Sequence, residues 1–424
     1  MRSRGPRCHA RSGSSGFPSR EKEDKVLTAD TTAQTVTPTR EELVSRASEV
    51  AGTLREHAGW SEENRRPHDD TVQALADAGI FRMRVPARYG GYESDATTLC
   101  EVAAELGRAD GSAAWTAAVY SIPTWMTGLF PDETQAEVFA TPDVRICGTL
   151  SPTAQAVPAE GGIVVDGRWG FITGALHAQW QIVVAVLMVP GGEPAPVMAL
   201  VPMDDLTIVD DWHTAGLKGT GSVTTIAERV FVPQARVMPM GAVIQGQSAS
   251  PTTAAGALHR APLLPVASAS SVGPVLGMAK GALDAFLHRL PDRKITYTSY
   301  GRQSDAALTH LQVADAVMRI DEAEFHVRRL AGQVDAKAAE ASEWTLAERV
   351  RARADMGAAC RLAKEAVDIL NTASGASSIR LDVPIQRFQR DIQAVCLHAL
   401  MHPDTNAELY GRFLCGLEPD TLYL

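Results

Sequence analysis

The sequence is poor in the features that mark small secreted, metal-stabilised or membrane proteins. None of its six cysteines stands in a Cys-x-x-Cys pair, which excludes a zinc knuckle and gives no disulfide framework. No apolar run is long enough to cross a bilayer: the longest, 182–189, stops at Pro190 and suits a buried strand. A chain with these absences fits a reduced, cytoplasmic location, and we expect no membrane partner.

An excess of positive charge is also missing. The net charge of −10 repels phosphate backbones, so we expect no nucleic-acid partner. The beginning of the sequence has no apolar signal-peptide core, and residues 1–38 are rich in Ser, Thr, Gly and Pro. We interpret 1–38 as a disordered tail, with a transit peptide as the alternative. The remaining chain, 45% hydrophobic and 21% charged overall, is that of a folded protein.

The rest of the chain changes character twice. Residues 39–144 show helical periodicity, and Thr39 followed by two glutamates is typical of a helix start. Residues 145–240 hold short β-rich runs separated by Gly, Pro and Asp. Residues 241–262 are small and polar and are expected to form a linker. Residues 263–424 are helical again, with apolar stripes and frequent Ala and Gly that favour closely packed helices.

Four short segments occur along the chain in a characteristic order. The first is Gly-Arg-Trp-Gly-Phe-Ile-Thr-Gly at 167–174, after a strand, and the second is Gly-Leu-Lys-Gly-Thr-Gly-Ser at 216–222, before one. Tyr-Gly at 300–301 precedes a long helix, and Pro-Ile-Gln-Arg-Phe-Gln-Arg-Asp stands at 384–391. Together they resemble the acyl-CoA dehydrogenase superfamily over about residues 40–424. The resemblance implies an α+β, mainly α fold: an N-terminal helical domain, a central antiparallel β-barrel or sandwich, and a C-terminal four-helix bundle.

One departure from the dehydrogenases points to a particular branch. Their catalytic Glu, expected in a Tyr-Glu-Gly-Thr loop, is absent, since 401–406 reads Met-His-Pro-Asp-Thr-Asn. His398-Ala399 instead resembles the oxygenase components of two-component, flavin-dependent aromatic hydroxylases. The resemblance implies a monooxygenase that uses reduced FMN or FAD and O2 to form a flavin C4a-hydroperoxide, which hydroxylates an aromatic or polycyclic small molecule. A closed apolar pocket would protect that adduct from water.

Reduced flavin has to come from elsewhere. The glycines at 216–221 do not form a dinucleotide fingerprint, because their spacing differs and a strand follows them. No other segment offers a nicotinamide site after a strand, so we expect a separate NAD(P)H:flavin reductase as partner. The resemblance further implies a homotetramer, built as a dimer of dimers, and a role in specialised metabolism such as antibiotic biosynthesis.

Two residues are expected to be catalytic. Thr173 matches the family position whose hydroxyl faces flavin N5, where it can both donate and accept a hydrogen bond; alternatively it is a turn residue bonded to its own backbone. His398 matches the branch's active-site histidine, which would act as a base or as a hydrogen-bond partner; alternatively it caps a helix end. No metal site is expected, because His402, four residues on, has no third ligand nearby.

The resemblance also assigns binding residues. Arg293 and Arg302 lie in the region that reaches the flavin phosphates, often across a subunit boundary, and Gly375 and Ser378 lie in a loop around the nucleotide. The expected cofactor-binding set is Thr149, Ser151, Phe171, Thr173, Arg293, Arg302, Gly375 and Ser378. The expected substrate-binding set is Trp125, Ser151 and His402. Each group also has a simpler explanation. The loop of Thr149 and Ser151 could be an ordinary Ser-Pro turn, the arginines could be basic helix caps, and Trp125 could be a core residue.

Three other functions stay open on the sequence. An amino-sugar N-hydroxylase would use the same oxygen chemistry, with less need for His398. An acyl-CoA dehydrogenase with a relocated base is a second alternative, for which Glu408 is the acid to test. A non-catalytic flavin-binding subunit is the third.

Overall fold

The computed structural model describes residues 37–424, so the expected tail at 1–38 lies almost wholly outside the described residues. The N-terminal part is helical, as predicted. Its helices are α1 (Arg40–Asn64), α2 (Asp69–Asp77), α3 (Ala96–Ala109), α4 (Gly111–Thr127) and α5 (Asp132–Val138). Thr39 is the N-cap of α1 and forms a reciprocal capping box with Glu42. This bond pair explains why the helix begins where the sequence predicts.

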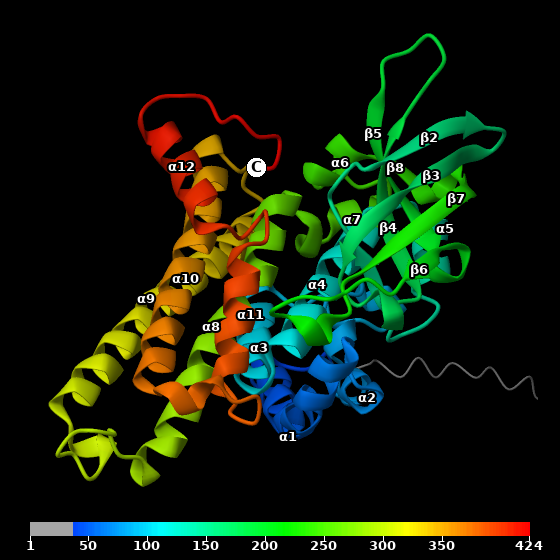
Figure 1. The fold of residues 1–424 in the computed structure, drawn as a ribbon. Coiled ribbons are helices and arrows are strands. Elements are labelled where there is room, and N and C mark those ends of the chain that lie inside the picture. The colour runs from blue at the N-terminus through cyan, green and yellow to red at the C-terminus, as the bar shows by residue number, and fades with distance from the viewer. Residues whose placement is uncertain (1–36) are drawn as a thin grey trace, which may run out of the picture. The chain divides into compact units, whose positions relative to one another are not determined.

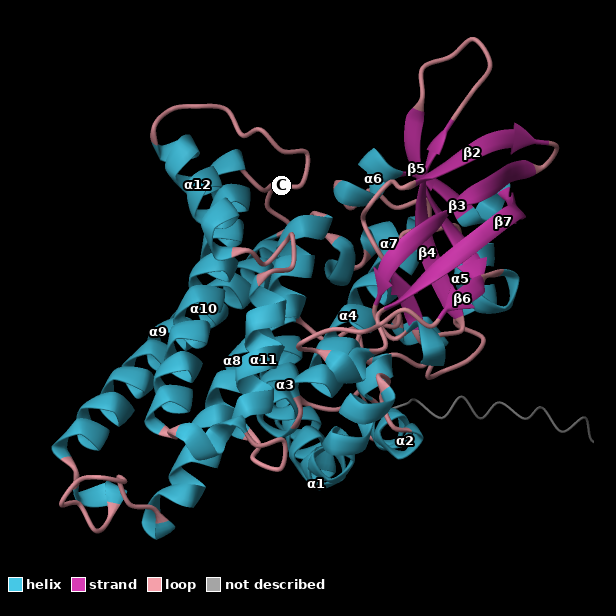
Figure 2. Cartoon of the chain, viewed as in Figure 1, coloured by secondary structure: helices cyan, strands magenta, loops and turns pink. Residues whose placement is uncertain are grey.

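The middle of the chain forms one eight-stranded sheet (Figure 2). Its strands are β1 (Ile146–Gly148), β2 (Ala154–Ala159), β3 (Gly162–Ile172), β4 (Trp180–Leu187), β5 (Ala195–Pro202), β6 (Thr207–Val209), β7 (Val223–Pro233) and β8 (Val237–Pro239). The order is β6-β7-β3-β2-β4-β5-β8, with β1 beside β4. The sheet is antiparallel except where β1 and β2 pair parallel with β4. The apolar run predicted as a buried strand is β4.

The segment 241–262, expected to be a linker, contains two short helices. These are α6 (Met240–Ile244) and α7 (Pro251–Ala255). Ser250 caps α7, and Val243, Ile244 and Ala261 are buried in the main hydrophobic core. Many of its small residues are exposed, so the segment is held by these few buried side chains.

The C-terminal part is a helical bundle (Figure 1). Its helices are α8 (Leu263–Arg289), α9 (Ala307–Glu340), α10 (Leu346–Ala373), α11 (Ile385–Cys396) and α12 (Pro403–Leu414). The close packing expected from small residues is present where α3 crosses α8. A Cβ on Gly277 would lie 2.2 Å from the carbonyl oxygen of Ala104, and one on Gly107 would lie 2.8 Å from that of Pro274. Only glycine lets these two backbones approach so closely.

Helix α4 is buried along almost its entire length and connects the halves of the molecule. It contacts β1 on one side and α3, α8 and α11 on others. A helix that is apolar all round belongs in a core, and α4 carries no charged side chain. No helix among residues 37–424 combines the length and apolar character needed to span a bilayer.

Candidate active site

Helix α4 brings together segments that lie far apart in the sequence. The Tyr120 hydroxyl donates a hydrogen bond to the carbonyl of Gly174, at 2.6 Å, which holds the turn after β3. One and a half helical turns earlier, the Trp115 ring meets the His398 ring edge to face, with centroids 5.5 Å apart. The two residues expected to be catalytic therefore border the same helix.

The turn after β3 has an unusual backbone. Phe171 adopts φ +61° although it is not glycine, and its ring is 75% exposed, with an edge contact to Trp212. Gly174 has φ +74°, and a Cβ there would lie 2.3 Å from the Tyr120 hydroxyl oxygen. Such strain persists only where the surroundings impose it, and it concentrates at functional sites. The exposed Phe171 ring is thus held in place and open to a ligand.

Thr173 belongs to a chain of buried hydroxyls. Its Oγ1 lies 2.8 Å from Ser222 Oγ, which in turn lies 2.7 Å from Thr220 Oγ1. Thr220 Oγ1 donates to the carbonyl of Leu217 at 2.9 Å. All three hydroxyl residues are buried. The alternative for Thr173, a turn hydroxyl bonded to its own backbone, does not describe these contacts.

The loop that carries Thr220 and Ser222 is fastened to α11 by a buried carboxylate. Asp391 Oδ1 accepts the amide of Leu217 at 2.6 Å, and a Cβ on Gly216 would lie 2.1 Å from the carbonyl oxygen of Arg390. Burial, with the charge of nearby Asp110, raises the pKa of Asp391 to about 7. Its second oxygen, Oδ2, has no hydrogen-bond partner in the described part of the chain.

His398 follows the last turn of α11. The residue is exposed on the single chain. Desolvation by the protein atoms nearby lowers the pKa of its imidazole, which favours the neutral ring at pH 7. The backbone amide of Leu400 donates to Nδ1 at 3.2 Å. In a neutral ring the proton must then be on Nε2. The imidazole consequently presents a donor, which favours the hydrogen-bond role over the role of base.

A buried arginine holds the turn that contains His398 and His402. Arg353 Nε donates to Asn406 Oδ1 at 2.7 Å, and Asn406 Nδ2 donates to the carbonyls of Leu400 and His402, both at 2.9 Å. Burial lowers the pKa of Arg353 to about 10. His402 itself is the N-cap of α12. Its predicted place in the substrate pocket is untested, and the structure gives it this capping role.

The last described residues fold back over the site. Arg353 Nη1 donates to the carbonyl of Tyr423 at 2.6 Å, and the Tyr423 hydroxyl donates to the carbonyl of Leu150 at 3.0 Å. Leu150 lies between Thr149 and Ser151, two expected flavin-contacting residues in the loop after β1. Tyr423 therefore joins the bundle to that loop. This contact, between positions 273 residues apart, has no signal in the sequence.

Trp125, expected to contact substrate, lies in the core. It is 0% exposed, donates its indole N–H to the carbonyl of Leu258 and stacks on His259. The side chain has no accessible surface in this structure, and its role as a substrate contact stays a prediction. Trp115, ten residues earlier on the same helix, is the tryptophan that borders His398.

The remaining expected cofactor residues gather at the end of the bundle formed by the α8–α9 connection, away from the sheet (Figure 1). A Cβ on Gly375 would lie 3.5 Å from Arg293 Nη2, and Ser378 donates to the carbonyl of Gly375 at 2.7 Å. Arg293 Nη1 is buried and has no hydrogen-bond partner among residues 37–424, and a donor of this kind suits an anion. Arg302 is more exposed and pairs with Asp305.

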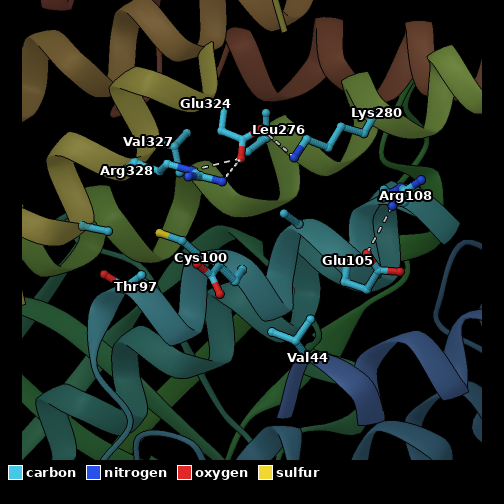
Figure 3. A pocket seen from close by; sticks show the side chains of 13 residues that line it. Val44, Thr97, Cys100, Glu105, Arg108, Leu276, Lys280, Glu324, Val327 and Arg328 are labelled. Carbon is cyan, nitrogen blue, oxygen red and sulfur yellow. Dashed lines mark hydrogen bonds and ion pairs between the residues drawn. The ribbon is translucent and has the colours of Figure 1, made fainter. Parts of the chain in front are cut away.

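Other clusters do not form part of this site. A cavity of about 310 Å³ lies between α1, α3, α8 and α9, where Glu324 pairs with Lys280 and Arg328 and Glu105 pairs with Arg108 (Figure 3). Its charges neutralise one another. Among the described residues, His57, His68 and Asp70 are close enough to hold a metal, but the Nδ1 of His68 already accepts the Asp70 amide as a helix cap.

Comparison with known proteins shows the family of the chain. Residues 37–142 match the model of the acyl-CoA dehydrogenase N-terminal domain, and residues 269–403 match that of the C-terminal domain. The chain is 32% identical over 391 residues to the oxygenase component of an FADH2-dependent resorcinol hydroxylase from a Rhizobium species, covering 90% of this chain and 96% of that one. It is 31% identical to a pigment production hydroxylase from a Rhodococcus species, covering 89% and 97%.

A solved structure has the same fold. XiaF from a Streptomyces species, determined in complex with FADH2 and glycerol, superposes with a TM-score of 0.86 at 31% identity. The match covers 91% of this chain and 98% of XiaF. The mainly helical fold with a central sheet, predicted from the sequence, is confirmed.

Proposed function

We propose that this chain is the oxygenase component of a two-component monooxygenase, because it belongs to the acyl-CoA dehydrogenase family and is similar to the flavin-dependent oxygenases in it. It takes reduced FMN or FAD from a separate NAD(P)H:flavin reductase and hydroxylates an aromatic or polycyclic small molecule with O2. The observation that carries this proposal is that helix α4 contacts both the Thr173 turn, through Tyr120, and His398, through Trp115. Support also comes from Glu408, the candidate dehydrogenase base, which is exposed on α12.

The residues present fit a flavin. Thr173 offers a buried hydroxyl and Phe171 an exposed ring beside it, which suits the isoalloxazine. Arg293 has a buried, unpartnered Nη1 that suits a phosphate. When bound, reduced flavin activates O2 and supplies one oxygen atom to the substrate. The protein supplies binding, orientation and exclusion of water.

We assign the following roles. Thr173 holds the flavin ring at N5. His398, neutral and protonated on Nε2, donates a hydrogen bond to the substrate oxygen or to the reacting oxygen. Trp115 fixes the plane of the His398 ring and forms an apolar wall beside it. Thr149, Ser151 and His402 border the substrate, and the Tyr423 contact to Leu150 closes the loop over it.

One chain does not place all of the cofactor residues together, which favours a second copy. The turn after β3, which carries Thr173, is bonded to Tyr120 of α4. The connection between α8 and α9, which carries Arg293, lies at the far end of the bundle (Figure 1). An apolar stripe on α9 is exposed, and its members are Leu308, Leu311, Met318 and Phe325. A stripe of this kind on a 34-residue helix is expected to pack against another helix. We propose a homotetramer, as a dimer of dimers, in which Arg293 reaches the flavin of a neighbouring copy.

The cellular location and the metabolic role of the protein are also proposals. A reductase that uses NAD(P)H favours a cytoplasmic location. The named relatives act in pigment production and on resorcinol, so we place this chain in the tailoring of an aromatic metabolite, antibiotic biosynthesis included.

The proposal is tested by adding anaerobically reduced FAD or FMN to the purified protein and a panel of phenols, followed by buffer saturated with ¹⁸O2. We expect one ¹⁸O atom in the product, detected by mass spectrometry, with little H2O2. The variant His398→Asn should bind flavin normally but release mainly H2O2. His310→Asn, at an exposed histidine on α9, is the control. Quantitative H2O2 from the wild-type protein with every phenol would instead identify a flavin-binding subunit without hydroxylase activity.

A further inference from the structure

The direction of each hydrogen bond in the hydroxyl chain follows from its end at Leu217. A carbonyl oxygen can only accept, and an oxygen 2.9 Å away with no proton between them would be repelled. We therefore direct the Thr220 O–H toward the Leu217 carbonyl, which also accepts the indole N–H of Trp212 at 3.0 Å and the Thr220 amide at 3.2 Å. This choice uses the only proton of the Thr220 hydroxyl.

The rest of the chain is then determined. Thr220 Oγ1 can only accept from Ser222, so the Ser222 proton points to Thr220. Ser222 Oγ in turn can only accept from Thr173, so the Thr173 proton points inward, to Ser222. No backbone amide donates to any of these three hydroxyls among the described hydrogen bonds. Toward a ligand, Thr173 presents lone pairs and no proton.

We infer that Ser222 and Thr220 are positioning residues that make the Thr173 hydroxyl an obligate acceptor and so select reduced flavin over oxidised flavin. This rests on the proposed function, which places Thr173 at flavin N5. Reduced flavin carries a hydrogen on N5 and can donate it to Thr173. Oxidised flavin has a lone pair on N5, which would face the lone pairs of Thr173. A protein that receives reduced flavin by diffusion gains by releasing the spent, oxidised form.

The loop is built to keep this arrangement. Leu217 has φ +51° and Gly221 has φ +56°, so the backbone at both ends of Lys218–Thr220 is left-handed. Asp391 fastens the amide of the same Leu217 whose carbonyl anchors Thr220. The amide of Gly174 donates to the carbonyl of Thr220 at 3.0 Å and so ties the loop to the Thr173 turn.

The test compares the affinities of the intact protein for oxidised FAD in air and for reduced FAD without oxygen, by titration, and repeats both with FMN. We expect the wild-type protein to bind the reduced form at least about tenfold more tightly, which raises the potential of bound flavin by about 30 mV. Thr220→Val removes the end of the chain without touching Thr173, and Ser222→Ala removes its middle. Each should lower the affinity ratio about fivefold or more, because Thr173 can then donate as well as accept.

Matched variants separate this role from a packing role. Thr225→Val is the control: Thr225 is fully buried at the start of β7 and its hydroxyl has no partner, so the ratio should not change. Thr220→Ser keeps the hydroxyl and should restore the wild-type ratio. Unfolding temperatures show whether each variant is folded, and Ser222→Ala gives the answer if Thr220→Val is not.

The outcomes distinguish the inference from the proposed function. If Thr220→Val and Ser222→Ala keep the wild-type ratio while Thr173→Val lowers it, the hydroxyl chain does not set the preference, and the inference is wrong. If Thr173→Val also keeps the ratio, Thr173 does not face N5, and its role in the proposed function fails as well.

Discussion

Replacing Asp391 by Asn should remove a large part of the dependence of stability on pH between about pH 4 and pH 8. Burial beside Asp110 raises the pKa of Asp391 to about 7 in the folded protein. In the unfolded chain this carboxyl has the ordinary pKa of about 3.9. The folded protein therefore holds the proton more tightly, so stability is greatest at low pH and falls as the pH rises from the lower pKa to the higher one. Above pH 8 the loss is complete.

The size of the effect follows from the two pKa values. Each pKa unit corresponds to 1.36 kcal/mol, so the ionised Asp391 costs about 4 kcal/mol at pH 8 relative to its protonated form. Asparagine keeps an oxygen for the Leu217 amide and has no charge to bury. We expect the variant to be more stable than the wild type at pH 8 and equal to it, or slightly less stable, at pH 4.5.

Equilibrium unfolding in urea at several pH values measures this difference. Asp166→Asn, at an exposed position on β3, is the control and should run parallel to the wild type. The difference in unfolding free energy between Asp391→Asn and the wild type should change by about 3–4 kcal/mol between pH 4.5 and pH 8, in favour of the variant at the higher pH. Curves that stay parallel would mean that Asp391 is not a buried, proton-holding group, and the reasoning from its surroundings would be refuted.

Three further results are expected. Because desolvation lowers the pKa of His398, the share of flavin oxidation that yields hydroxylated product should stay constant as the pH falls through about 6.5, the ordinary imidazole value; a fall centred there would contradict the lowered pKa. Tyr423→Phe loses the hydrogen bond to Leu150, which is worth about 1 kcal/mol. Limited proteolysis should therefore cut the segment after α12 about fivefold faster. The control is Tyr410→Phe, which loses a hydrogen bond to Arg351 and should not change that rate. Phe325→Asp on the α9 stripe should yield a smaller assembly by light scattering, and an unchanged mass would remove α9 from the interface.

The elements of the fold were largely predictable because their signals are local. The capping box at Thr39, the apolar run of β4 and the small residues that let α3 and α8 touch each act over a few residues. The segment 241–262 shows the limit of such local signals. Its composition is that of a linker, and only the surrounding sheet and bundle show that Val243 and Ile244 are buried.

The site was predictable where a motif marked it and obscure where contacts are distant. Thr173 and His398 come from segments that resemble a family, but Ser222 joins Thr173 across 49 residues and no spacing rule connects them. Periodicity could not separate Trp115 from Trp125, because α4 is buried on all sides and every face is apolar. The pairing of Asp391 with Leu217 likewise depends on how α11 meets a loop from the sheet.

Helix α4 has a consequence for how the protein melts. Because it is shared by the sheet and the bundle, neither part can separate from it without exposing a long apolar surface to water. Calorimetry should therefore record one cooperative transition for residues 37–424, not one for each layer of the molecule. Unfolding of the sheet would also unfold the part of the bundle that carries His398. Heat inactivation and loss of secondary structure should therefore share a single midpoint.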